Sequence, residues 1–363
     1  MSPETEAAYI VVSDVHLGSE QCNQNEFCCF LEWINSLSSQ ENTDQIVKCK
    51  NKEVKIKKPC KIILLGDIVE LWGPKDGDRD NVIKDSMRPL SLLTSVGCDK
   101  IYVVGNHDYS LGELEGKINW EHLCNETELD IYDSHYPKKD KNGIPHGFNI
   151  GNRSYFFLHG HQFDKEQAVL AYVSHLIGEL WNPLNWFQVL YNIPFTKKHW
   201  KRNFVIFLGL VFGGKYLMWS AFLQSSFWVT AIWAIITGFF AFSSIPGIVA
   251  HTQEIIYKHI NPLDKTAEEV INDEYYKKKK DTIQADIVVF GHTHFASYCA
   301  LELSEKEGQK KKKLFVNSGC WVGTDEDING KMRYSNTFIY IDKAGAYIMR
   351  WCGSGKIDCI DVV

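Results

Sequence analysis

Short hydrophobic segments alternate with longer amphipathic segments from residue 9 to about residue 110. The short segments are rich in Ile, Val and Leu and are each followed by polar residues; they are Tyr9–Ser13, Lys61–Leu65 and Lys100–Val104. Apolar residues recur at helical spacing in Asn25–Leu37 and Asn81–Val96. This βαβαβ order predicts a sheet with a parallel core, with active residues on the loops at the carboxyl ends of its strands.

A second β-rich region lies toward the end of the chain. Its predicted strands are Arg153–Leu158, Ile287–Phe290, Leu314–Asn317, Thr337–Ile341 and Ala346–Arg350. Between Asp164 and Asp286 the sequence becomes helix-like and carries many tryptophans. We therefore predict one discontinuous catalytic domain, residues 1–164 and 286–363, that is interrupted by a helical insertion at residues 165–285.

Several basic segments are predicted to lie at the surface. The polar, lysine-bearing residues 40–60 are expected to form a surface excursion, and Lys310–Lys313 is expected to form a hairpin loop. Lys277–Lys280 is typical of a solvated helix end. Arg153 and Arg333 are candidates for phosphate contact, although a surface role is favoured for each.

The composition is that of a globular protein, with 45% hydrophobic and 23% charged residues. A net charge of −6 weighs against a protein that coats nucleic acid, so no nucleic-acid partner is expected. The first β-rich segment begins at Tyr9, so no secretory signal peptide is expected. Eleven cysteines without a Cys-x-x-Cys pair favour free thiols in a reducing compartment over a disulfide framework.

Polar residues that a strand does not need cluster directly after five of the hydrophobic segments. They are Asp14 and His16; Gly66 and Asp67; Gly105, Asn106, His107 and Asp108; His159 and His161; and His292 and His294. Each motif alone is explained more simply by a tight turn, because Gly and Asn tolerate left-handed backbone geometry. Five in this order favour convergence on a dinuclear metal site. Imidazole and carboxylate ligands without cysteine suit Mn, Fe, Zn or Mg and argue against a structural zinc.

The series Asp-x-His, Gly-Asp, Gly-Asn-His-Asp, His and Gly-His-x-His resembles the calcineurin-like metallophosphoesterase family, over roughly two thirds of the chain. The resemblance implies an α/β fold, a four-layer α/β/β/α sandwich, here with a long, partly hydrophobic insertion. It also implies the metal ligands. One metal would be held by Asp14, His16 and His294, the other by Asn106, His159 and His292, and Asp67 would bridge the two.

A bridging carboxylate keeps two cations close together, and a water between them loses a proton readily enough to attack phosphorus in line. By the resemblance, His107 protonates the leaving oxygen, and Asp108 is placed to orient the imidazole of His107. His161 is either a further ligand or a residue that supports one, and we predict the supporting role. The expected cofactors are two divalent cations, with manganese ahead of iron, zinc and magnesium.

The chain is also partly similar to the UDP-2,3-diacylglucosamine pyrophosphohydrolases, which carry a helical insertion after a His-Gly motif. That similarity implies a phosphoesterase acting on a lipid-linked phosphate. The sequence departs from that group by placing His161 after His159-Gly, where the group usually has aspartate, and by a longer insertion. The similarity therefore leaves the identity of the substrate open.

The insertion contains two apolar stretches, Phe204–Leu223 and Phe227–Val249, in which only Lys215 is charged. Each has about the length that crosses a bilayer, roughly 20 residues, so residues 204–249 are expected to form a membrane-embedded hairpin. Basic residues and a tryptophan at 197–202 precede it and favour the cytoplasmic side for the catalytic domain. A buried lid or a dimerisation hairpin is the alternative, and Lys215 weighs against a lone deep crossing.

The expected function is hydrolysis of a phosphomonoester or pyrophosphate bond on a lipid-linked or amphiphilic substrate at the membrane. Two alternatives remain at this point. A soluble phosphodiesterase or nuclease keeps the chemistry but leaves the apolar insertion unexplained. A non-catalytic, membrane-associated scaffold of the same fold belongs to another class of protein, although every expected ligand position carries a suitable residue.

Overall fold

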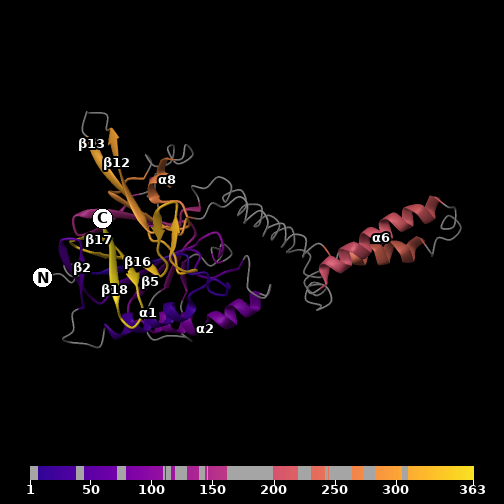
Figure 1. The fold of residues 1–363 in the computed structure, drawn as a ribbon, viewed down its shortest axis with the longest axis horizontal. Helices are drawn as coiled ribbons and strands as arrows, with labels where there is room; N and C mark the ends of the chain where they lie inside the picture. Colours follow the sequence, from indigo (N-terminus) through magenta and orange to yellow (C-terminus); the bar gives the residue numbers. More distant parts are fainter. Residues whose placement is uncertain are drawn as a thin grey trace. The chain divides into compact units, whose positions relative to one another are not determined.

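A computed structural model of the 363-residue chain shows two compact units (Figure 1). It describes residues 7–37, 45–71, 79–108, 111, 116–118, 129–138, 144, 146–161, 199–219, 230–241, 244, 264–272, 283–304 and 310–363. The first unit comprises Met1–Ala171 and Pro262–Val363, and the second comprises Tyr172–Asn261. The first unit is thus built from both ends of the chain.

The first unit contains an eight-stranded mixed sheet. Its strands lie in the order β18 (Ile357–Val362), β17 (Gly345–Trp351), β16 (Thr337–Asp342), β1 (Tyr9–Val12), β4 (Lys61–Leu65), β5 (Asp99–Val103), β7 (Leu129–Tyr132) and β6 (Gly116–Ile118). Strands β1, β4, β5 and β7 are parallel neighbours, and the remaining neighbours pair antiparallel. The predicted parallel core is confirmed.

A second, six-stranded sheet belongs to the same unit. Its order is β12 (Ser297–Ser304), β13 (Lys310–Asn317), β11 (Ile287–Phe290), β10 (Arg153–Leu158) and β8 (His135–Tyr136), and β9 (Phe148–Ile150) pairs with β10. Strands β10, β11 and β13 are parallel. Two short ribbons complete the unit, β2 (Gln45–Cys49) with β3 (Lys52–Ile56) and β14 (Glu326–Ile328) with β15 (Lys331–Arg333).

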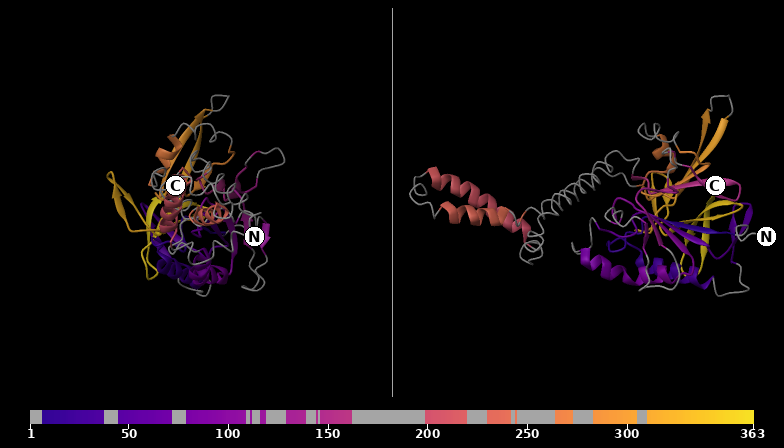
Figure 2. Two further views of the ribbon diagram at one scale, coloured as in Figure 1. Left: turned by 90° about the vertical axis from the view of Figure 1, so that its right-hand side faces the viewer. Right: turned by 180° about the vertical axis from the view of Figure 1, so that it is seen from behind.

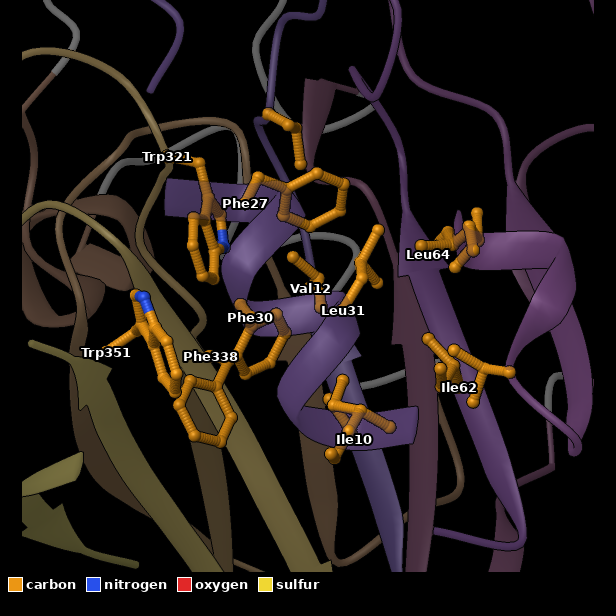
Figure 3. Packing of buried hydrophobic residues seen from close by; sticks show 14 of the residues in the cluster. Ile10, Val12, Phe27, Phe30, Leu31, Ile62, Leu64, Trp321, Phe338 and Trp351 are labelled. Atoms are coloured by element: carbon orange, nitrogen blue, oxygen red, sulfur yellow. The ribbon is translucent and has the colours of Figure 1, made fainter. Parts of the chain in front are cut away.

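Side-chain alternation along the strands divides the core into separate layers. Ile10 and Val12 of β1 pack with α1 (Gln24–Ser36) and α2 (Arg79–Ser95), whereas Tyr9 and Val11 face the six-stranded sheet. Aromatic residues fill the helix side of the first sheet, where Phe30 lies between Trp321 and Phe338 (Figure 3). The α/β class is confirmed.

The six-stranded sheet is covered on its other face by α8 (Ala267–Asn272), the short orange helix beside this sheet in Figure 2. Its apolar residues are buried in one cluster with Phe156 and Phe315. The order of layers is therefore helices, sheet, sheet, helix. α8 falls within the range predicted for the insertion, yet it belongs to the first unit, because its apolar residues are buried against this sheet.

The structure of residues 45–56 differs from two predictions, the surface excursion and the free thiols. Instead of a surface excursion they form the β2–β3 hairpin, whose Val47, Val54 and Ile56 are buried in the core. Cys49 of this hairpin forms a disulfide with Cys359 on β18. The prediction of free thiols is wrong for this pair, because its partners lie 310 residues apart and no local spacing reveals them. Eight further cysteines among the described residues are free.

The prediction for Lys310–Lys313 was also wrong. These residues begin β13 and pair with β12, so they extend a strand rather than close a loop. Lys313 is buried, and its Nζ donates a hydrogen bond to the carbonyl of Ile283 at 2.6 Å. A lysine can occupy such a position because its long apolar stem carries the charge to an acceptor. Lys277–Lys280 lies outside the described residues.

The second unit contains α6 (Trp200–Trp219) and a further helical segment at residues 230–241. The two helices touch closely, since a Cβ at Gly214 would lie 2.0 Å from the ring of Trp233. Six of the nine large hydrophobic side chains that are exposed among the described residues lie here, at Val205, Phe212, Ile232, Ile235, Ile236 and Phe239. These helices therefore present apolar rather than polar faces outward.

Within the described part of the chain, no helix combines the length and the hydropathy needed to cross a membrane. The polar turn Gln224–Ser226 and much of the stretch Phe227–Val249 lie outside that part.

Candidate metal centre

The seven predicted ligands come together where the strands of both sheets end. β1, β4 and β5 are adjacent and parallel, and so are β10 and β11, so that within each sheet the carboxyl ends lie at one edge. Asp14 and His16 follow β1, Asp67 follows β4, Asn106 follows β5, His159 follows β10, and His292 and His294 follow β11. All seven side chains are buried.

Asp14, His16 and His294 form the first group of candidate ligands, with donor atoms within 4.8 Å of one another. The Nε2 atom of His294 lies 3.3 Å from Oδ1 of Asp14 and 3.3 Å from Nε2 of His16. Two imidazole nitrogens and one carboxylate oxygen thus point at a common centre. Such a set suits a divalent cation.

Asp67, His159 and His292 form the second group, again with donor atoms within 4.8 Å of one another. Nε2 of His159 lies 3.1 Å from Oδ2 of Asp67 and 3.1 Å from Oδ1 of Asn106. The same Asp67 oxygen lies 4.0 Å from Nε2 of His16 in the first group. Asp67 therefore lies between the groups, where a bridging carboxylate is needed.

The backbone of these loops is unusual, because five of the seven residues adopt left-handed conformations. Their φ angles are 51° at Asp14, 52° at His16, 53° at Asp67, 74° at His292 and 56° at His294. Non-glycine residues in sparsely populated backbone regions cost about 1–3 kcal/mol each and gather at functional sites. The surrounding structure holds this strain in place and directs the side chains inward.

Hydrogen bonds that involve the backbone connect neighbouring loops of the site. The amide of His16 donates to the carbonyl of Asp67 at 2.9 Å, and the amide of His292 donates to Oδ2 of Asp14 at 2.9 Å. Nδ1 of His159 lies 2.7 Å from the carbonyl of Leu65 and donates to it, which leaves Nε2 of His159 facing the second group. These hydrogen bonds therefore orient the candidate ligands toward the two donor groups.

The glycines of two motifs are required by close approach rather than by a turn. A Cβ at Gly105 would lie 2.2 Å from Oδ1 of Asp67, and a Cβ at Gly291 would lie 2.4 Å from Oδ2 of Asp14. Larger residues at either position would displace a candidate ligand.

Sequence reasoning missed Glu70, a buried carboxylate that supports two histidines. Its oxygens lie 2.8 Å from Nδ1 of His107 and 2.9 Å from Nδ1 of His16. An ionised carboxylate only accepts, so both imidazoles donate through Nδ1 and keep Nε2 for other partners. The available signal was a charged residue between Val69 and Leu71, three positions after Asp67.

Glu70 and His107 influence each other's ionisation. Burial alone raises the pKa of Glu70, but the charge and hydrogen bonds of His107 and His16 hold that pKa well below its usual range. Burial alone lowers the pKa of His107, yet Glu70 and Asp67 raise it to about 9. The imidazole of His107 is thus favoured in its protonated form, as a general acid requires.

The role predicted for Asp108 needs correction. Its carboxylate accepts the amides of Ile68 at 2.9 Å and Gly105 at 2.6 Å, and the hydroxyl of Tyr102 at 2.5 Å. Burial and the neighbouring Asp67 raise the pKa of Asp108 to about 6. Asp108 therefore ties together the loops after β4 and β5, whereas Glu70 orients His107.

His161 is buried beside the second group. Its ring centroid lies 5.4 Å from that of His159 and 6.4 Å from that of His292. The donor group of Asp67, His159 and His292 does not include it. A supporting role for His161 stays a prediction.

A family model described as calcineurin-like phosphoesterase matches residues 8–296. The chain belongs to this family. The predicted family and the predicted class, a metal-dependent phosphoester hydrolase, are therefore confirmed. Among curated proteins, none matches the chain.

Two solved structures show only distant likeness to this phosphoesterase. A double mutant of Vps29 from Entamoeba histolytica is 10% identical, with a TM-score of 0.27 over 98% of each chain. A dimetal phosphatase from Danio rerio is 9% identical, with a TM-score of 0.35 over 94% of this chain and 95% of that chain. At these values neither likeness bears on the activity of this phosphoesterase.

The buried charged groups of the phosphoesterase site suit the binding of cations. Burial alone raises the pKa of Asp67, but His159 and His107 hold it well below its usual range. Burial alone lowers the pKa of His159, but Asp67 raises it to about 10. The buried carboxylate and imidazole groups thus favour positive charge between them, and divalent cations would supply such charge. The nitrogen and oxygen donors fit two such ions.

Proposed function

We propose that this phosphoesterase is a dinuclear hydrolase that cleaves a phosphomonoester or pyrophosphate bond of a lipid-linked or amphiphilic substrate at a membrane surface. One observation carries the proposal: two buried donor groups, with Asp67 of the second group 4.0 Å from His16 of the first, occur in a chain that also presents exposed apolar helices. The catalytic unit faces the cytoplasmic side.

Each residue of the site has a distinct task in this proposal. Asp14, His16 and His294 would hold one cation, Asn106, His159 and His292 would hold the other, and Asp67 would serve both. When bound, the pair supplies an activated water and neutralises charge on the phosphoryl oxygens. Manganese is the proposed ion, and the mixed imidazole, amide and carboxylate set also accepts iron, zinc or magnesium.

His107 delivers the proton that the leaving oxygen needs. Glu70 engages Nδ1 of His107, so the proton on Nε2 is the one available for transfer. The same carboxylate also holds His16, and it therefore fixes the acid relative to a ligand of the first cation.

The second unit supports an amphiphilic substrate and a membrane partner. Phe212 is 69% exposed and Ile235 is 71% exposed, which is costly in water unless a lipid phase or an apolar chain covers them. Lys201 and Arg202 are exposed at the start of α6, where cationic side chains attract anionic headgroups. An apolar face beside basic residues is typical of helices at a membrane interface.

The test compares the rates at which the detergent-purified protein, supplied with manganese, hydrolyses different substrates. We expect turnover of lipid pyrophosphates or lipid monophosphates to exceed that of a nitrophenyl diester. In a double variant, Phe212→Gln with Ile235→Gln, the hydrolysis rate on lipid substrate in vesicles is expected to fall by about tenfold or more, because two apolar contacts with the membrane are removed. Its rate on the soluble diester is expected to be unchanged.

The alternatives predict different outcomes. Equal rates of the double variant and the wild type on vesicles would contradict the membrane proposal. Turnover of the diester alone, by protein that stays in the aqueous fraction, favours a soluble phosphodiesterase. Bound metal without turnover on any phosphoester favours a scaffold.

A further inference from the structure

Thr293 lies between the candidate ligands His292 and His294 and makes two short hydrogen bonds to a distant segment. Its carbonyl accepts the amide of Asp264 at 2.7 Å, and its hydroxyl donates to the carbonyl of Lys265 at 2.7 Å. The ligand loop is therefore held on both its backbone and its side chain by residues 264–265.

The hydroxyl of Thr293 has a second partner inside the sheet. Nδ2 of Asn317, at the end of β13, donates to this hydroxyl at 2.8 Å and to the carbonyl of Gly291 at 3.0 Å. Asn317 is fully buried. The hydroxyl thus donates and accepts at once, which serine could also do but valine could not.

Asp264 is itself fixed from the other side. Its φ angle is +84°, and Oδ1 lies 3.3 Å from Nε of Arg333 on β15. The side chain of Arg333 is only 12% exposed, which corrects the prediction of a surface arginine. Lys331 on the same strand pairs with Glu269 of α8 at 3.2 Å, so β15 contacts both Asp264 and the helix that follows it.

Residues 264–265 lie directly after the second unit in the chain. The second unit ends at Asn261, and Asp264 follows three residues later. The segment on which the chain re-enters the catalytic unit is therefore bonded to the loop that carries His294 of the first group and His292 of the second.

We propose that Thr293 and Asp264 are positioning residues, which set the geometry of His292 and His294 through the segment that returns from the helical unit. The inference rests on the proposed two-metal function. A shift of residues 264–265 would move one ligand of each cation together.

The test measures manganese affinity by calorimetry and the absorption spectrum of the cobalt-loaded protein. Thr293→Val is expected to weaken affinity by about 10- to 100-fold and to change the cobalt spectrum, because ligand orientation is lost. Thr293→Ser is expected to restore both. Thr266→Val is the matched control, since the hydroxyl of Thr266 donates to Glu269 at 2.8 Å, and its hydrogen bonds within the described residues do not reach the ligand loop.

A second variant tests the same positioning role if Thr293→Val does not fold. Arg333→Gln leaves Thr293 intact and is expected to weaken affinity several-fold, whereas Arg350→Gln removes the Arg350–Asp325 ion pair and is expected to leave affinity unchanged. Thermal unfolding in chelator shows whether each pair of variants is matched in stability.

The two proposals fail differently. Wild-type affinity and spectrum in Thr293→Val, or equal losses in Thr266→Val, would overturn the positioning role while the two-metal function stands. A wild-type protein that takes up no cation would overturn the function, and the positioning role with it.

Discussion

Replacing Asp67 with alanine is expected to lower kcat/KM by about 10²- to 10³-fold, the loss that follows when a charge-stabilising group is removed from a site. Oδ2 of Asp67 lies 3.1 Å from His159 in the second group and 4.0 Å from His16 in the first. Without this carboxylate, nothing at that position joins the two cations. The measurement is manganese-saturated hydrolysis of a soluble phosphodiester.

Asp342→Ala is the control for this prediction. Its carboxylate accepts the amides of Ala344 and Gly345 in a turn of the same sheet, away from the candidate ligands. We expect its rate to stay within about twofold of wild type, as for most surface changes. Substantial activity in Asp67→Ala, within tenfold of wild type, would contradict a bridging role.

His107→Gln is expected to reduce kcat by about 10²- to 10⁴-fold on substrates with a poor, alkyl leaving group. The loss is expected to be much smaller on a nitrophenyl ester, whose leaving oxygen departs without a proton. Glu70→Gln is expected to lower kcat on alkyl substrates by a smaller factor, again with little loss on the nitrophenyl ester. Glu70 accepts a hydrogen bond from Nδ1 of His107 and raises the pKa of His107. The measurement is a leaving-group series at saturating manganese.

Exposed His146→Gln serves as the matched control and is expected to leave both rates unchanged. Metal affinity of His107→Gln is expected to stay near wild type, since His107 is not among the predicted ligands. Equal losses on both leaving groups would show that His107 acts through the metals or through folding rather than by proton transfer.

Local patterns predicted the elements that carry the site. β1, β4 and β5 are continuous apolar segments because they are buried on both faces, and α1 shows its helical spacing because one face packs on the sheet. The polar residues after these strands stand out against that background. Their convergence followed from the parallel topology.

Features that depend on distant contacts were not predictable from the same patterns. Glu70 gains its role only when the loops after β1 and β5 approach it, and Asp108 binds amides of two loops that folding brings together. The partners Cys49 and Cys359 meet because β2 lies beside β18. Such contacts are set by tertiary structure, and no period in the sequence encodes them.

The most direct test of the two-metal centre is an anomalous diffraction map of manganese-loaded crystals. We expect two peaks about 3.5–4 Å apart on either side of Asp67. One should lie beside Asp14, His16 and His294, and the other beside Asn106, His159 and His292. A single peak, or peaks away from these residues, would contradict the dinuclear assignment.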